Sequence, residues 1–237
     1  MRLGLMLCFC CIAGKGLAED NIIDVGLHYA APWAYADASG QVVGIDYDVV
    51  KQIFSQAGYE LRVELFSHER MLQKFRHKEL DFVSPVAFDI PGAHRTLAYM
   101  EIEDVAVSLD TAGLNNLVLE DLADMRIVAY QKAADVLGKG FVDALNPDAY
   151  LEIVDRQRQF ELLTNHKVDL VIGDKLVLKY FAQKRLGKGK IRIHSLFDKQ
   201  AYPAAAWDPQ LVSVFNQGLQ TLKGSEAWNR IMAKPRP

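Results

Sequence analysis

The chain has 237 residues, of which 50% are hydrophobic and 24% are charged, and its formal net charge is −3. This composition is typical of a globular protein and excludes a collagen-like, low-complexity or broadly disordered chain. The near balance of 27 basic and 30 acidic residues argues against a nucleic-acid-binding protein, which usually carries a basic excess.

The first eighteen residues predict a signal peptide. Arg2 precedes an apolar run over residues 3–12, and Gly16 and Ala18 supply small residues for a cleavage site. The run is too short to cross a bilayer as a helix, and no other segment is apolar for long enough. We therefore expect cleavage after Ala18 and a soluble, periplasmic product; a buried N-terminal strand is the alternative. The mature chain would then lack thiols, because all three cysteines lie in this segment: Cys8, Cys10 and Cys11.

Two blocks of alternating strands and helices follow. In each block, β-branched or alternating segments predict strands, and apolar residues at helical spacing predict helices. The first block is predicted to contain a strand at 22–27, a loop at 29–40, a helix at 45–57, a strand at 61–65, a helix after Ser67 and a strand at 81–84. The second is predicted to contain strands at 126–130, 150–154 and 169–172 and helices at 133–144, 156–165 and 176–186. This order favours an α/β fold with parallel strands covered by helices.

Extended stretches without helical period connect the blocks, at 101–116 and 191–207, and two helices at 209–222 and 225–232 close the chain. A chain that leaves one block, builds a second and returns predicts two lobes with a double hinge and a ligand cleft between them. We expect a first lobe from residues 19–108 and 198–237, and a second lobe from residues 109–197.

The order of these motifs resembles the bacterial periplasmic solute-binding proteins of family 3, which bind polar amino acids. The resemblance covers nearly the whole mature chain and implies the two-lobed type II periplasmic-binding-protein fold. It rests on the aromatic loop before the segment GIDYDVVKQIFSQAG, on ELFSHERMLQKFRHKELDFV, on the arginine of AHRTLAYM and on HKVDLVIGDKLVLKYF.

The resemblance also implies where the ligand is bound. Arg95 lies where the family's arginine holds the ligand α-carboxylate, and Asp174 lies where an acid holds the ligand amine. An arginine fork and a compact carboxylate suit the two ends of a zwitterion. The other residues placed in the site are the aromatic side chains and polar groups at matching positions: Tyr29, Trp33, Phe66, Ser84 and Lys132. Taken alone, Asp174 can also be the N-cap of the helix that follows it.

Two departures weaken the inference that the ligand is a standard amino acid. Most family members carry Gly-Thr or Gly-Ser after the first strand of the second lobe, and its hydroxyl and amides bind the ligand carboxylate. Here Lys132 and Ala133 stand at those positions, so the hydroxyl is missing while the backbone amides remain. In addition, Arg95 lies about two residues later than the family spacing, and Ser84 is the only hydroxyl in the turn before it.

The leading hypothesis is a monomeric periplasmic protein that binds a small polar solute and delivers it to an inner-membrane ABC transporter. The alternatives are a ligand sensor that signals to a membrane receptor and a dehydratase-like enzyme on the same fold. No metal or cofactor is expected, because the six histidines show no metal-ligand spacing and the chain has no P-loop, GxGxxG or GxSxG motif.

Overall fold

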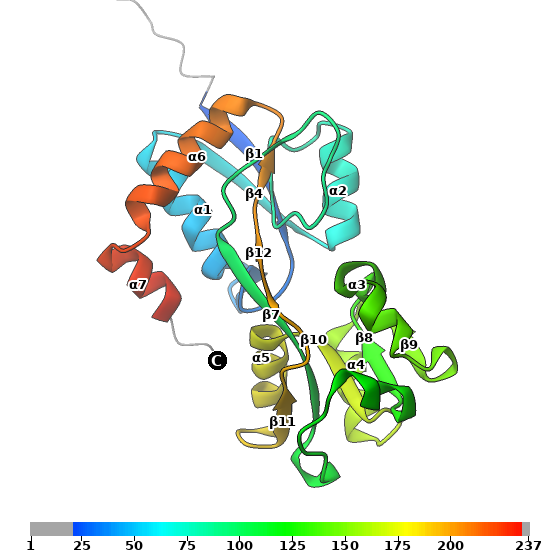
Figure 1. The fold of residues 1–237 in the computed structure, drawn as a ribbon. Helices are drawn as coiled ribbons and strands as arrows, with labels where there is room; N and C mark the ends of the chain where they lie inside the picture. The colour runs from blue at the N-terminus through cyan, green and yellow to red at the C-terminus, as the bar shows by residue number, and fades with distance from the viewer. Residues whose placement is uncertain (1–20, 234–237) are drawn as a thin grey trace, which may run out of the picture.

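The computed structural model describes residues 21–233 as two α/β lobes joined by two long crossing segments (Figure 1). The predicted signal peptide and its cleavage site lie outside the described residues. No helix within residues 21–233 has the length and apolarity that a bilayer crossing requires.

Lobe one is built on a sheet with the strand order β4-β1-β5-β13-β6. Strands β4 and β5 run parallel to β1, and β13 pairs antiparallel with β5 and β6. The elements of this lobe are β1 (Ile22–His28), β2 (Tyr35–Ala36), β3 (Val42–Val43), α1 (Ile45–Gln56), β4 (Glu60–Phe66), α2 (His68–Arg76), β5 (Phe82–Ser84), β6 (His94–Arg95), β13 (Ala205–Ala206), α6 (Pro209–Leu222) and α7 (Glu226–Ala233).

Lobe two is built on a sheet with the order β11-β7-β10-β8-β9, in which β8, β9 and β10 are parallel and β7 runs antiparallel to β10 and β11. Its elements are the 3₁₀ helices η1 (Asp110–Ala112), η2 (Leu119–Asp124) and η3 (Pro147–Ala149), with β8 (Ile127–Ala129), α3 (Ala133–Asp143), β9 (Tyr150–Glu152), α4 (Arg156–Thr164), β10 (Leu170–Asp174), α5 (Lys175–Leu186) and β11 (Ile191–His194).

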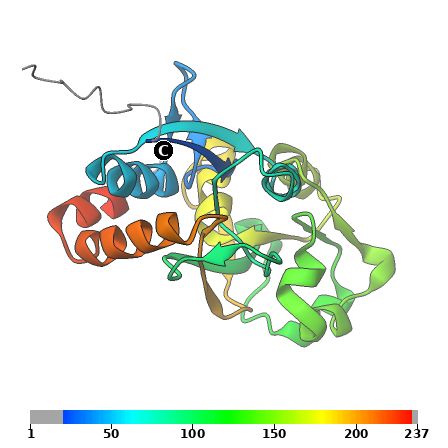
Figure 2. The ribbon, with the colours of Figure 1, turned by 90° about the horizontal axis from the view of Figure 1, so that it is seen from above.

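Alternate strand residues point to opposite faces of a sheet. Both faces of each sheet carry apolar side chains, and helices cover both of them. In lobe one, α1, α6 and α7 pack on one face around Phe54 and Phe215, and α2 packs on the other through Phe75 (Figure 2). In lobe two, α4 and α5 pack on one face around Phe160, and α3 packs on the other around Phe141. The core of each lobe therefore lies on both sides of its own sheet.

The connection between the lobes is formed by β7 (Met100–Leu109) and β12 (Lys199–Tyr202). The first residues of β7 pair with β12, and its later residues pair with β10 and β11, so one strand passes from the connection into the second sheet. The predicted α/β architecture with two connecting segments is observed. The lobe boundaries predicted at residues 108/109 and 197/198 stay a prediction.

Several elements differ from prediction. The loop at 29–40 contains a two-residue strand, β2, that pairs with β3. Ser67 occupies the N-cap position of α2, but its side chain makes no capping hydrogen bond. Helix α3 is interrupted at Gly138, which has φ 80° and ψ −173°. Strand β10 runs two residues beyond the predicted end, so Asp174 is both its last residue and the N-cap of α5.

Candidate functional site

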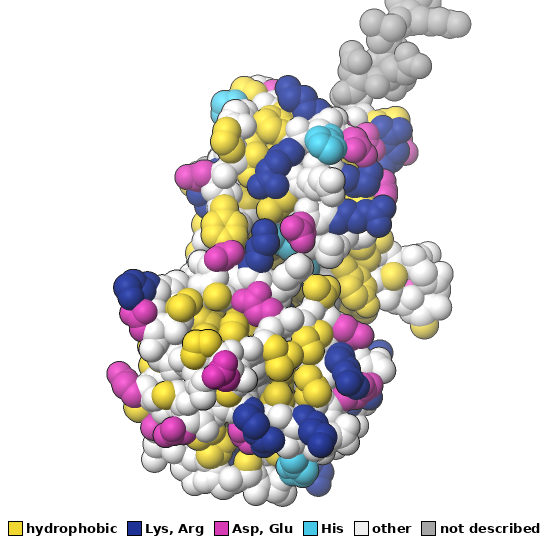
Figure 3. All heavy atoms as spheres, turned by 90° about the vertical axis from the view of Figure 1, so that its right-hand side faces the viewer, with side chains coloured by type: hydrophobic (Ala, Val, Ile, Leu, Met, Phe, Trp, Pro, Cys, Tyr) yellow, Lys and Arg dark blue, Asp and Glu magenta, His cyan; other side chains and the backbone are white. Residues whose placement is uncertain are grey.

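A cavity of about 520 Å³ lies between the two lobes. It is lined at the carboxyl ends of β1, β4 and β5 in lobe one and of β8, β9 and β10 in lobe two. Ligands of open α/β sheets bind outside the carboxyl ends of the strands, where loops and helix N-termini converge. Figure 3 views the molecule from the side that carries α2 and α3, where exposed hydrophobic side chains lie among charged ones.

Asp174 is the most unusual polar group in the cavity. Its Oδ1 accepts hydrogen bonds from Trp33 Nε1 at 3.0 Å and from the Val177 backbone N–H at 2.9 Å. Its Oδ2 is buried and has no hydrogen-bond partner among the described residues. Burial raises the pKa of Asp174, while the bonds from Val177 and Trp33 and the charge of Arg156 oppose that rise. An unpaired buried carboxylate oxygen is costly, so this atom is suited to a donor that arrives with a ligand.

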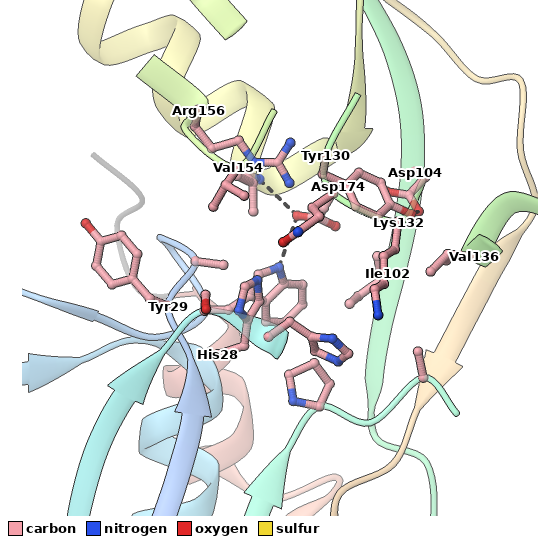
Figure 4. Close-up of a pocket in the computed structure, with 18 of the residues that line it drawn as sticks. His28, Tyr29, Ile102, Asp104, Tyr130, Lys132, Val136, Val154, Arg156 and Asp174 are labelled. Atoms are coloured by element: carbon pink, nitrogen blue, oxygen red, sulfur yellow. Dashed lines mark hydrogen bonds between the residues drawn. The ribbon is translucent and has the colours of Figure 1, made fainter. Parts of the chain in front are cut away.

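Arg156 brings a cation to the same cavity (Figure 4). It is the first residue of α4, whose N-cap is Asp155. Its Nη1 donates to Gln159 Oε1 at 3.0 Å, and its guanidinium lies 5.4 Å from the ring centre of Tyr130. Gly173 leaves room for it, because a Cβ there would stand 2.9 Å from Nη1. Burial lowers the pKa of Arg156, and the charges of Asp104 and Asp174 oppose this lowering. No carboxylate of the described residues lies within 4.0 Å of its guanidinium nitrogens.

A second acid, Asp104, lies on β7 where the connection enters lobe two. Its Oδ2 accepts a hydrogen bond from the Tyr130 hydroxyl at 2.9 Å. Burial raises the pKa of Asp104 to about 6, and the nearby charge of Asp174 adds to this rise. The same surroundings raise the pKa of the Tyr130 hydroxyl, again mainly through burial. The cavity wall in lobe two therefore holds two buried acids, Asp104 and Asp174, close to Arg156.

Among the described residues that line the cavity, lobe one contributes two histidines and one acid, Glu69, but no lysine or arginine. The rings of His28 and His68 both line the cavity and meet edge to face, with centroids 5.7 Å apart. Burial lowers the pKa of His28 to about 3, with further lowering from His68 and Arg156. Burial also lowers the pKa of His68. Both imidazoles are therefore neutral at neutral pH and act as hydrogen-bonding, partly aromatic walls.

Of the seven residues placed in the site from the sequence, four line this cavity: Tyr29, Trp33, Lys132 and Asp174. Tyr29 is exposed at 55% and lies at the rim. Asp174 also makes the alternative N-cap contact, to Val177.

The other three lie outside the cavity lining. Phe66 is buried in the core under α2 and covered by Arg70 and Lys74. Ser84 is fully buried and hydrogen-bonded to Asp46 and Tyr99. Arg95 lies on the edge strand β6 and pairs with Asp89 at the surface. The structure does not bring these three residues to the cavity, and their assignment as ligand contacts stays a prediction.

Five further polar or charged residues that line the cavity were not predicted from the sequence: His28, His68, Asp104, Tyr130 and Arg156. His28, Tyr130 and Arg156 follow or end strands β1, β8 and β9, so the rule of carboxyl strand ends would have found them. Asp104 carries no such signal, because it lies inside a strand. Among the described residues, no group of three or more His, Cys, Asp or Glu side chains is placed to hold a metal ion.

Two α/β lobes, a two-strand connection and a cleft at the carboxyl strand ends define the type II periplasmic-binding-protein fold. Residues 23–90 match the sequence profile of the bacterial extracellular solute-binding proteins, family 3, which confirms the family resemblance predicted from the sequence. A probable amino-acid ABC transporter-binding protein of Haemophilus influenzae is 23% identical over 198 residues, covering 81% of this chain and 76% of that protein.

Solved structures agree on the fold. A substrate-binding protein of an ABC uptake transporter from Streptococcus pneumoniae, with bound histidine, superposes with a TM-score of 0.75 at 15% identity, over 90% of this chain and 92% of that one. An amino acid ABC transporter substrate-binding protein from the same species, bound to L-arginine, gives a TM-score of 0.74 at 20% identity, over 90% and 93% of the two chains.

Proposed function

We propose that this chain is a periplasmic solute-binding protein that captures a small zwitterion, an amino acid or a close relative, by closure of its two lobes. The observation that carries this proposal is the unpartnered, buried Oδ2 of Asp174 in a cavity between the lobes. A ligand ammonium would give this oxygen its missing donor and a charge of opposite sign. Arg156 in the same wall offers the complementary charge.

The similar proteins support a role in amino-acid transport. The Haemophilus influenzae protein is described as an amino-acid ABC transporter-binding protein, and the superposed structures hold histidine or arginine. We therefore propose that this protein acts as a monomer, is exported by a signal peptide over residues 1–18 and delivers its solute to an inner-membrane ABC transporter. No covalent chemistry is needed for this role.

The first test is a binding screen with the protein produced from residue 19 and refolded to remove any co-purified solute. The twenty L-amino acids are tested by thermal shift and then by calorimetry. A ligand present at 100 times its Kd stabilises the folded state by about 2.7 kcal/mol, which gives a clear shift in Tm. If no amino acid binds, the proposed ligand class is wrong.

The decisive variant is Asp174→Asn. It keeps the capping oxygen but removes the charge, so the affinity should fall about 10- to 100-fold, as for other hydrogen bonds to charged groups. Asp208→Asn is the matched control, because Asp208 caps α6 in the same way at an exposed position outside the cavity. Equal affinity in Asp174→Asn and the wild type would contradict the proposed role of Asp174.

A gene deletion in the native organism distinguishes a transport role from a sensing role. Deletion of the gene should abolish uptake of the radiolabelled amino acid found in the screen. Normal uptake together with an altered transcriptional response to that amino acid would favour a sensor and contradict the transport role.

A further inference from the structure

Helix α3 begins at the cavity, and an acid of the chain itself already accepts from two amides at its N-terminal end. The carboxylate of Glu152, at the end of β9, accepts hydrogen bonds from the Lys132 backbone N–H at 2.6 Å and the Ala134 backbone N–H at 3.0 Å. The Tyr150 hydroxyl donates to the same carboxylate at 2.7 Å. Lys132 itself is the N-cap and makes no side-chain capping bond. The chain thus supplies its own anion to this helix N-terminus.

A ligand carboxylate would be disfavoured at that position. It would compete with Glu152 for the same donors and would stand beside a like charge. The resemblance to the family places the ligand carboxylate at these amides and at Arg95. Here the Glu152 carboxylate already accepts from amides at the start of α3, and Arg95 lies at the surface in a pair with Asp89.

Two basic side chains of the described residues line the cavity and could bind the ligand carboxylate: Lys132 and Arg156. The Lys132 side chain is half exposed, and its Nζ lies 3.9 Å from Glu69 Oε1 across the gap between the lobes. The charge of Lys132 is therefore partly neutralised by Glu69 and is exposed to water. The histidines of lobe one are neutral at neutral pH, as their lowered pKa values require. Among the described cavity residues, Arg156 is the cation without an ionic partner.

The position of Arg156 is fixed by its surroundings. Gln159 accepts from one guanidinium nitrogen, Tyr130 lies against the guanidinium face, and Gly173 provides the space. The guanidinium has five N–H donors, so most remain for a carboxylate, which it can meet with two parallel bonds. Asp174, with its unpartnered Oδ2, lies in the same wall (Figure 4).

We propose, building on the proposed function, that Arg156 binds the ligand carboxylate while Asp174 binds the ligand ammonium, and that Glu152 closes the alternative site at α3. Both charged ends of the amino acid are then held by lobe two alone. Lobe one closes over the ligand with Trp33 and the neutral histidines and takes no part in neutralising its charges. The preferred solutes are amino acids with a free α-carboxylate.

The test compares each L-amino acid that binds with its α-carboxamide, starting with L-arginine and L-histidine and their carboxamides. The amide keeps the ammonium and loses the negative charge, so the ratio of the two Kd values isolates the carboxylate contact. The wild type should prefer the acid at least about 10-fold, as expected for a charge-assisted contact. Arg156→Gln should weaken acid binding about 10- to 100-fold and bring the ratio close to one.

Three variants serve as controls. Arg158→Gln removes an exposed arginine two residues further along α4, which pairs with Glu161 outside the cavity, and should leave the ratio unchanged. Arg95→Gln should also leave it unchanged. Arg156→Lys keeps the charge but loses the fork, so it should retain part of the preference; it also substitutes for Arg156→Gln if circular dichroism shows that the latter does not fold.

The outcomes separate this inference from the proposed function. If the wild type binds no amino acid, the function itself fails. If it binds amino acids but Arg156→Gln keeps the full acid preference, only the present inference is wrong. A loss of preference in Arg95→Gln would place the carboxylate in lobe one. A rise in preference in Glu152→Gln, with no change in Arg156→Gln, would place it at α3; either result overturns the inference.

Discussion

Ser84, Asp46 and Tyr99 form a buried polar cluster in lobe one. The Ser84 hydroxyl donates to Asp46 Oδ1 at 3.2 Å and lies 2.6 Å from the Tyr99 hydroxyl, which also donates to Asp46. Asp46 is 1% exposed, and burial raises its pKa from the ordinary 3.8 to about 6, against the hydrogen bonds from Tyr99 and Ser84. The hydroxyl that sequence reasoning assigned to a ligand therefore stabilises a buried carboxylate.

This cluster predicts a pH dependence of stability. The pKa of Asp46 is higher in the folded protein, so the folded state holds a proton that the unfolded chain releases between about pH 4 and 6. The contribution of Asp46 to stability is therefore greatest below pH 4 and is lost as the pH rises through 6. Relative to Asp46→Asn, the wild type should lose about 3 kcal/mol of unfolding free energy between pH 4 and 7, as an upper estimate for a shift of this size.

Urea unfolding at several pH values measures this difference. Only the difference between the two proteins is informative, because His28 and His68 have lowered pKa values and shift the absolute stability in the opposite direction. Asp48→Asn, in the same turn of α1 but not buried, controls for the loss of an acid from that helix. A pH-independent difference between the wild type and Asp46→Asn would rule out the predicted linkage.

At the scale of elements, the N-terminus of α1 and the loop that carries Trp33 depend on each other. Helix α1 has no side-chain cap; instead the Ile45 and Asp46 amides donate to the carbonyls of Pro32 and Trp33. Gly44 allows this contact, with φ 133°, and a Cβ there would stand 2.2 Å from the Trp33 carbonyl oxygen. Since Trp33 donates to Asp174, the start of α1 also positions a cavity wall.

Gly44→Ala should therefore lower the unfolding free energy by about 2–4 kcal/mol, through backbone strain and overlap with a neighbouring main chain. It should also weaken ligand binding, because the loop with Trp33 must move. Gly40→Ala is the control, since Gly40 also has a positive φ, 84°, but no atom lies within 4 Å of its added Cβ. That control should cost about 1–2 kcal/mol and leave affinity unchanged. Equal losses in the two variants, measured by chemical denaturation and calorimetry, would contradict the proposed clash.

The elements show which features a sequence can predict. Strands such as β1 and helices such as α6 follow from local periodicity, and the predicted ranges match closely. Asp174 was selected because a possible N-cap and the family position of the acid coincide at one residue. The position of Arg95 away from the cavity could not be predicted, because it depends on how β6 pairs with β13, a tertiary contact. Arg156 was not predicted because its position at the cavity depends on Gly173 and Tyr130, which lie apart from it in sequence.

At the scale of the whole molecule, the two lobes touch on opposite sides of the cavity in different ways. On one side, Trp33 donates to Asp174, and Val177 of α5 is buried in the core of lobe one. On the other, Glu69 of α2 makes polar contacts with the residues just before α3, with Gln131 Nε2 at 3.4 Å and Lys132 Nζ at 3.9 Å. Such exposed contacts contribute at most about 1 kcal/mol. Motion about β7 and β12 should therefore open the cavity between α2 and α3.

We expect ligand to shorten the distance across this mouth, because a solute held by lobe two gives lobe one new contacts only in the closed form. The protein produced from residue 19 has no cysteine, so two can be introduced for fluorescent labels, Arg76→Cys on α2 and Lys139→Cys on α3. Energy transfer between the labels should rise with saturating amino acid. It should stay constant with Arg76→Cys and Lys51→Cys, which both lie in lobe one. In an Asp174→Asn background, a higher ligand concentration should be needed for the same rise, in proportion to the loss of affinity. Unchanged transfer across the mouth while calorimetry reports binding would mean that the cleft accepts its ligand without hinge closure.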